Sequence, residues 1–214
     1  MKITKVLAAA AFAAAALAAS QASSAKALVL YYSQLGPEKA ADAHPSEDMG
    51  NTQYLAYAIK NAVDGDIFRV ENATPYPDNG YKALTEVAKK ERQTNARPAM
   101  KGDLPDLSAY DTVYIGAPVW WSDYPMVFYT MLDRYDFAGK TLVAFNTNGG
   151  SGPGVMVSTL KRAEPNARVL DDCLDISSSQ SKQSDESVKT WLNAHSLLNK
   201  ELSRNKLITL SQNR

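Results

Sequence analysis

Polar residues suited to binding a phosphate group surround the expected start of a helix. Gly50 permits a close backbone approach, and Asn51 and Thr52 offer amide and hydroxyl groups at the first helical positions. Ser33 and Gln34 precede this group in the chain. The N-terminus of a helix presents unpaired N–H groups and a partial positive charge, which favour phosphate. The alternative is that Asn51 or Thr52 only caps its own helix.

Two adjacent tryptophans occupy a second loop. This loop contains Pro118, Val119, Trp120 and Trp121. Exposing two large rings to water is costly, whereas stacking a ring on a flat ligand buries it and adds about 0.5–1.5 kcal/mol beyond the area term. The alternative is that the tryptophans cover the core beneath the loop, and we expect this of one of the two. The pair therefore predicts an aromatic wall for a planar ligand.

A third loop is rich in glycine, with four glycines among residues 149–154. Glycine is costly in backbone entropy, and it is favoured where N–H groups approach a ligand or where φ must be positive. The alternative is an ordinary flexible loop. The candidate binding residues of this loop are Thr147, Asn148, Gly149, Gly150, Ser151 and Gly152.

Short apolar runs alternate with helical patterns along the chain. Strands are expected at residues 26–32, 66–71, 111–116, 141–146 and 168–176, with the second suited to a sheet edge. Helices are expected at residues 51–63, 80–92, 126–135, 154–163 and 184–198. This alternation predicts an α/β fold of parallel βαβ units. Ligands of such sheets bind outside the carboxyl ends of the strands, where the three loops are expected to lie.

The three loops in this order resemble those of flavodoxins, particularly the flavodoxin-like group with an aromatic pair in a Gly-x-Pro-x-Trp-Trp loop. The resemblance extends over residues 26–198. It implies a three-layer sandwich around a five-stranded parallel sheet in the order 2-1-3-4-5. It also implies noncovalently bound FMN. Carried over by the matching motifs, the phosphate would be held by Ser33, Gly50, Asn51 and Thr52, with Gln34 beside them. The isoalloxazine ring would be lined by Pro118, Val119, Trp120 and Trp121, and closed on its other side by residues 147–152.

Two features depart from the family pattern. The family has a compact phosphate loop, whereas residues 36–49 form a long insertion here. The insertion either loops outward and leaves the phosphate site intact, or folds over the flavin and supplies contacts such as His44 or Ser46. Many electron-carrying flavodoxins are strongly acidic and this chain is nearly neutral, which puts docking by charge to a basic partner in question.

The N-terminal residues 1–25 have the pattern of a secretory signal. Lys2 and Lys5 precede an apolar run of 14 residues, 6–19, and small residues follow. The run is shorter than the ~20 residues of a membrane-spanning helix. We therefore expect removal of the segment, with the cut after residue 25 or a few residues earlier, and a periplasmic or secreted protein without stable membrane insertion. A retained anchor is the alternative.

Composition excludes several other classes of protein. Removing 25 residues from 214 leaves 189, with 21 basic and 23 acidic side chains, and this balance argues against nucleic-acid binding. Cys173 is interpreted as a small buried residue, and His44 and His195 lack metal-ligand spacing. The chain also lacks a Gly-x-Ser-x-Gly elbow and a phosphate-binding Gly-x-x-x-x-Gly-Lys pattern. The tail, residues 199–214, is expected to be weakly ordered.

The resemblance implies an FMN-dependent redox protein that exchanges electrons with an unknown partner protein or small-molecule acceptor. Whether it is an electron carrier or an enzyme stays open. One alternative is an NAD(P)H-dependent quinone or nitro-reductase, which needs a substrate pocket beside the ring; Tyr76, Tyr81 and Tyr124 are candidates for lining it. The other alternative is a flavodoxin-fold binding module without FMN.

Overall fold

A computed structural model describes residues 26–198; the expected signal segment and the tail, residues 1–25 and 199–214, lie outside the described residues. The strands are β1 (Ala27–Tyr31), β2 (Asp66–Arg69), β3 (Thr112–Pro118), β4 (Thr141–Asn148), β5 (Arg168–Val169) and β6 (Leu174–Ser177). The α-helices are α1 (Asn51–Val63), α2 (Tyr81–Gln93), α3 (Met126–Arg134), α4 (Met156–Ala163) and α5 (Asp185–Ala194). Two short 3-10 helices are η1 (Leu107–Ala109) and η2 (Ser181–Gln183).

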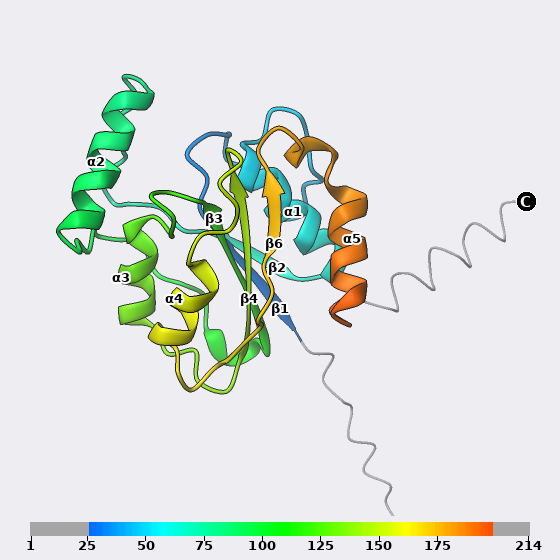
Figure 1. The fold of residues 1–214 in the computed structure, drawn as a ribbon. Helices are drawn as coiled ribbons and strands as arrows, with labels where there is room; N and C mark the ends of the chain where they lie inside the picture. The colour runs from blue at the N-terminus through cyan, green and yellow to red at the C-terminus, as the bar shows by residue number, and fades with distance from the viewer. Residues whose placement is uncertain (1–25, 199–214) are drawn as a thin grey trace, which may run out of the picture.

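The strands form one parallel sheet in the order β2-β1-β3-β4-β5, which confirms the predicted order, with β2 at an edge (Figure 1). Helices cover both faces. α1 and α5 pack on one face with Val29 and Val143, and α3 and α4 pack on the other with Leu30 and Ile115. Successive residues of a strand point to opposite faces, so the continuous apolar run of β1 is buried on both sides. The predicted three-layer sandwich is therefore confirmed.

The fifth position of the sheet differs from the expectation of a single strand over residues 168–176. Two short strands, β5 and β6, both pair with β4, and residues 170–173 interrupt them. At the break, the carboxylate of Asp172 accepts a hydrogen bond from the amide of Cys173 at 2.9 Å and another from Trp191 Nε1 at 3.0 Å. A local side-chain acceptor of this kind competes with the strand ladder for backbone donors.

The ends of β3 and β4 extend two residues beyond their predicted limits, and this extension matters for the site. Pro118 pairs with Thr147 in the last register position, and β4 continues to Asn148. Rigid strands rather than loops therefore carry these residues to the carboxyl edge of the sheet. Within residues 26–198, no helix has the length and apolar character needed to cross a membrane.

Candidate functional site

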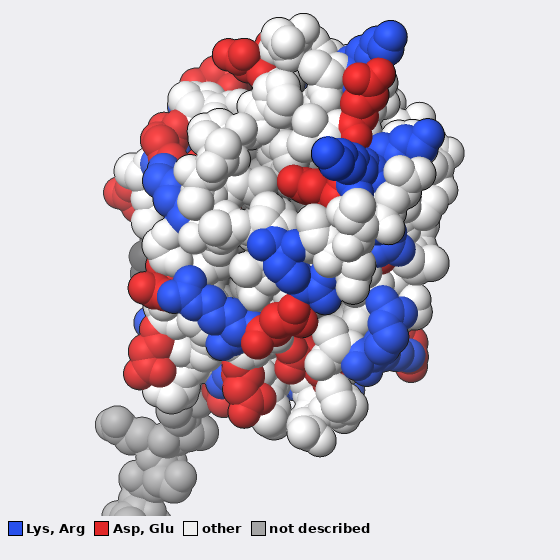
Figure 2. Space-filling view, turned by 90° about the vertical axis from the view of Figure 1, so that its left-hand side faces the viewer, with Lys and Arg blue, Asp and Glu red and all other residues white. Residues whose placement is uncertain are grey.

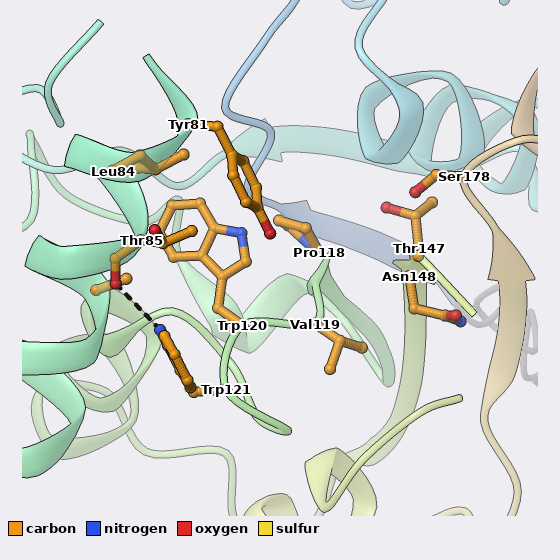
Figure 3. A pocket seen from close by; sticks show the side chains of 12 residues that line it. Tyr81, Leu84, Thr85, Pro118, Val119, Trp120, Trp121, Thr147, Asn148 and Ser178 are labelled. Carbon is orange, nitrogen blue, oxygen red and sulfur yellow. Dashed lines mark hydrogen bonds between the residues drawn. The ribbon is translucent and has the colours of Figure 1, made fainter. Parts of the chain in front are cut away.

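A cavity of about 400 Å³ lies at the carboxyl ends of β3 and β4 (Figure 3). Its lining consists of Tyr81, Leu84, Thr85, Ala88, Pro118, Val119, Trp120, Trp121, Thr147, Asn148, Gly149 and Ser178. Figure 3 shows Trp120 and Tyr81 at one end and Thr147, Asn148 and Ser178 at the other. The second and third predicted loops therefore meet where ligands of an open parallel sheet bind. Gly150, Ser151 and Gly152 follow in the same loop without lining the cavity.

Both tryptophans belong to a tight turn. The Trp120 N–H donates to the carbonyl of Asp123 at 2.9 Å, and the Asp123 N–H donates to the carbonyl of Trp120 at 3.1 Å. The two central residues, Trp121 and Ser122, have φ values of 50° and 66°. Turns of this shape normally carry Asn or Gly, because other side chains are strained at positive φ. The aromatic wall therefore rests on a strained backbone.

The two indole rings have different surroundings. Trp120 makes edge-to-face contacts with Tyr32 and Tyr76, with ring centroids 5.4 and 5.1 Å away, so it packs on the core as expected for one ring of the pair. Trp121 is 48% exposed, and its Nε1 donates to the carbonyl of Thr85 in α2 at 3.2 Å. The Lys89 ammonium lies 5.4 Å from the centre of the Trp121 ring. Trp121 thus ties the turn to α2.

The glycine-rich loop is organised by the side chain of Asn148. Its Oδ1 accepts hydrogen bonds from the amides of Gly150 at 2.6 Å and Gly152 at 3.3 Å. Its Nδ2 donates to the carboxylate of Asp175 in β6 at 2.6 Å. Of the two reasons for glycine in this loop, a close approach of N–H groups to a ligand and a positive φ, the first does not hold for these two amides, because the protein itself supplies their acceptor. The positive φ values of Gly150 and Gly152, 104° and 73°, explain why glycine stands there.

The start of α1 reaches the cavity through Thr52. Its buried hydroxyl lies 2.7 Å from the hydroxyl of Thr147, which lines the cavity. Asn51 is exposed, and its Oδ1 accepts a hydrogen bond from Ser181 at 2.9 Å. Neither residue caps the helix with its side chain, because the N-cap position is Gly50. The first amides of α1 have no acceptor within the helix, as at any helix N-terminus.

Ser33 and Gln34 lie beside Gly50 but outside the main cavity. They line a separate hollow of about 310 Å³. The Ser33 hydroxyl donates to the carbonyl of Leu35 at 2.7 Å, and Gln34 Oε1 accepts a short hydrogen bond from Tyr32. A Cβ atom on Gly50 would lie 2.1 Å from the Leu35 oxygen and 2.3 Å from Ser33 Oγ. Only glycine therefore allows the first loop to close against the start of α1.

The insertion, residues 36–49, lies along α1 and leaves the cavity free. It begins and ends at the same place, since a Cβ on Gly36 would lie 2.5 Å from the backbone nitrogen of Gly50. His44 Nδ1 lies 3.3 Å from a side-chain amide of α1, and Ser46 donates to a carboxylate of the insertion at 2.7 Å. Neither residue lines the cavity. The structure matches the outward-looping alternative.

Helix α2 supplies a wall of the cavity that the motifs did not reveal. Tyr81, Leu84, Thr85 and Ala88 all line it, and Tyr81 is 82% exposed. Their spacing of three to four residues puts them on one helical face, a signal that equally describes packing on the core. Ser178, from the loop after β6, was also missed. Of the tyrosines considered for a substrate pocket, Tyr124 is buried and donates to the carbonyl of Ile115 at 3.1 Å.

A carboxylic acid is hydrogen-bonded to the aromatic cluster formed by Tyr32, Tyr76 and Trp120. Glu91 accepts a hydrogen bond from the Tyr76 hydroxyl at 2.6 Å, and partial burial raises the pKa of this carboxyl above its usual value. Cys173, interpreted from the sequence as a small buried residue, is only partly buried and packs against the core, and this burial raises the pKa of its thiol to about 12. In the described part of the chain, no three His, Cys, Asp or Glu residues are grouped to hold a metal ion.

Charges on the face beside the cavity are mixed. Figure 2 shows the side that carries α2 and α3, with basic and acidic side chains next to one another. Arg97 pairs with Asp133 at 2.5 Å, and Arg134 pairs with Asp103. The lining of the cavity contains no Lys, Arg, Asp or Glu. The site is therefore suited to an uncharged, planar group.

Comparisons with known proteins agree with this geometry. The flavodoxin family model matches residues 26–195. A provisionally assigned flavoprotein from Bacteroides uniformis is 29% identical, with a TM-score of 0.61, and the match covers 79% of this chain and 98% of that one. A flavoprotein in complex with FMN from Lactobacillus acidophilus is 22% identical, with a TM-score of 0.54 over 74% of this chain and 97% of that one. No curated protein matches.

Proposed function

This chain belongs to the flavodoxin family, and on that premise we propose that it binds FMN noncovalently and acts as a redox protein. The observation that carries the proposal is the cavity itself. It has an aromatic wall in the turn after β3, a polar wall at the end of β4, and no charged side chain in its lining. The neighbouring structure from Lactobacillus acidophilus, a complex with FMN, gives further support.

The residues present fit both ends of FMN. Trp120, Val119 and Tyr81 would cover the flat ring, and Thr147 and Asn148 would face its polar edge. Thr52 and the first-turn amides of α1 would hold the phosphate, where a helix N-terminus favours negative charge. The close approach of the first loop to Gly50, which a Cβ would prevent, brings Ser33 next to the start of α1.

Bound FMN would supply one- and two-electron transfer at its ring. The chain's own contribution is to place the ring, limit its contact with water and set its surroundings. Since no Lys or Arg lines the cavity, the side chains offer no cation to a negatively charged ring. Such surroundings disfavour added negative charge and would lower the reduction potential. We propose an electron-carrying role in the periplasm or outside the cell, following the expected export signal.

A second candidate is a binding module that keeps the fold without FMN. The observation in its favour is that several expected ligand donors are already engaged. Asn148 holds the amides of Gly150 and Gly152, and Gln53 Oε1 accepts the N–H of Gly50 at 3.2 Å. A ligand that needs these donors must replace internal hydrogen bonds, which reduces the net gain from binding.

Titration of the purified protein with FMN separates the two candidates. Tryptophan fluorescence reports ring binding, and riboflavin is the comparator because it lacks the phosphate. We expect FMN to bind more tightly than riboflavin. A protein that binds neither would refute the proposal and favour the module. For the loaded protein, stopped-flow mixing with NADPH and a quinone then distinguishes a carrier from a reductase, since rapid direct reduction by NADPH identifies a reductase.

A further inference from the structure

Asp123 is a buried charged residue at the base of the tryptophan turn. Its side chain is fully buried, with 0% exposure. Through its backbone it closes the turn by the two hydrogen bonds to Trp120. It does not line the cavity, so its charge serves no direct contact there. Burying a carboxylate is costly unless it is paired and fully hydrogen-bonded, so the surroundings of this one are informative.

The Asp123 carboxylate joins three helices. Its Oδ2 accepts from Arg92 Nη1 of α2 at 2.8 Å, from the Tyr129 hydroxyl of α3 at 2.6 Å, and from the Thr159 hydroxyl of α4 at 3.0 Å. Its Oδ1 accepts from the amide of Tyr124 at 2.8 Å. Arg92 also donates to the Tyr129 hydroxyl at 2.8 Å, so two partners of the carboxylate are hydrogen-bonded to each other. These contacts fix the turn relative to α2, α3 and α4.

The turn needs such bracing because its backbone is strained. Trp121 and Ser122 adopt positive φ without being glycine, and a conformation of this kind persists only where the surroundings enforce it. At the start of α4, the Val155 amide donates to the carbonyl of Ser122 at 2.8 Å. A Cβ on Gly154 would lie 2.1 Å from that same carbonyl oxygen. The turn is therefore held through the Asp123 side chain and through the Ser122 backbone.

Arg92 belongs to α2, the helix that lies beside the tryptophan turn at the same end of the cavity (Figure 3). α2 carries Tyr81, Leu84 and Thr85 into the cavity, and α2 itself buries only Ala88. An ion pair between Arg92 and Asp123 thus sets the spacing between α2 and the tryptophan turn. We propose that Asp123 and Arg92 are positioning residues that hold the two walls of the ring site at the separation and orientation a flavin needs. This inference rests on the proposed function.

Replacing Asp123→Asn removes the charge and keeps the shape. We expect FMN to bind on the order of tenfold more weakly or worse, as for loss of a hydrogen-bonded buried charge. The near-UV circular dichroism of the tryptophans in the FMN-free protein should also change. The matched control is Asp133→Asn, which breaks the exposed pair with Arg97 on the same face and should leave both readouts unchanged. Tyr129→Phe keeps the carboxylate and removes the hydroxyl that donates to Asp123 and accepts from Arg92, and it serves if Asp123→Asn does not fold.

A second substitution tests the strain directly. Ser122→Gly lets the turn adopt positive φ without cost. In the Asp123→Asn background it should recover part of the lost FMN affinity, whereas in the parent it should change the affinity less than twofold. Equal effects of Ser122→Gly in both backgrounds would overturn the link between the ion pair and the strained turn.

The outcomes separate this inference from the proposed function. If the parent binds FMN and both Asp123→Asn and Tyr129→Phe bind it equally well, the inference is wrong and the function stands. If the parent binds no FMN, the proposed function fails. The near-UV circular dichroism of the FMN-free protein then still tests whether Asp123 positions the tryptophan turn. A signal altered in Asp123→Asn but not in Asp133→Asn supports the positioning role. An unaltered signal overturns it.

Discussion

The two ends of the proposed FMN site, a ring end and a phosphate end, are built in different ways. At the ring end, α2, the turn of residues 120–123 and the end of β4 come from distant parts of the chain, and the ion pair between Arg92 and the buried Asp123 joins two of them. At the phosphate end, residues 33–36 and 50–53 meet through the close approach of Gly36 to Gly50. The ring end depends on tertiary contacts between helices, whereas the phosphate end depends on the absence of two side chains.

This difference in construction predicts how binding and stability respond to substitutions at each end. A change at the ring end removes aromatic surface or disturbs the spacing of two walls, so its effect reaches both stability and binding. A change at the phosphate end acts on one group of the ligand, so it should discriminate between FMN and riboflavin. The predictions below test this division, in order of decreasing effect.

Trp120→Ala should have the largest effect. The ring packs against Tyr32 and Tyr76 and lines the cavity, so its loss should lower the free energy of unfolding by about 3 kcal/mol. FMN affinity should fall by about 1–3 kcal/mol, and riboflavin affinity by the same amount. Trp121→Ala, at a half-exposed ring, should cost less in both measurements. Denaturant unfolding and fluorescence titration provide the data, and a larger effect at Trp121 would contradict the assignment of the main wall to Trp120.

Gly50→Ala should have the next largest effect, and at the phosphate end. The added Cβ would lie within 2.3 Å of both the Leu35 oxygen and Ser33 Oγ, so the first loop must move. We expect a destabilisation of about 1–3 kcal/mol and weaker binding of FMN than of riboflavin relative to the parent. For stability, the matched control is Gly149→Ala, where a Cβ would meet nothing within 4 Å. Equal stability of the two alanine variants would show that the first loop does not need its close approach.

The two ends also differ in how far the sequence predicts them. Helix α1 and the convergence of the second and third loops follow from local periodicity and from the rules of parallel sheets, and the strand order follows from the resemblance to flavodoxins. The wall from α2 did not follow, because Leu84 and Ala88 have the same spacing whether they line a cavity or the core. The role of Asp123 was equally hidden, since its partners Arg92 and Thr159 lie 31 and 36 positions away in the chain. Contacts between distant helices leave no local pattern.

Thr52→Val should have a smaller and more selective effect. It keeps the size of the side chain and removes the hydroxyl that contacts Thr147 at 2.7 Å. If that hydroxyl holds the phosphate, as proposed, FMN affinity should fall by about 1 kcal/mol while riboflavin affinity stays close to that of the parent. Parallel titrations with both ligands measure the difference. An equal loss for the two ligands would place the hydroxyl at the ring end instead.

Glu91→Gln should have the smallest effect, visible only in its dependence on pH. Burial raises the folded-state pKa of Glu91 above the usual 4.5, so folding favours the protonated acid. The stabilising contribution is complete below about pH 4.5 and is lost as the pH rises through the folded-state pKa. The parent should therefore lose stability relative to Glu91→Gln as the pH rises above about 4.5, and solvent screening keeps this loss small. Glu86→Gln on the same helix is the control for loss of one charge. If the free energy of unfolding depends on pH in the same way for the parent and Glu91→Gln, Glu91 stays well solvated. The ring end would then be less tightly closed than its packing indicates.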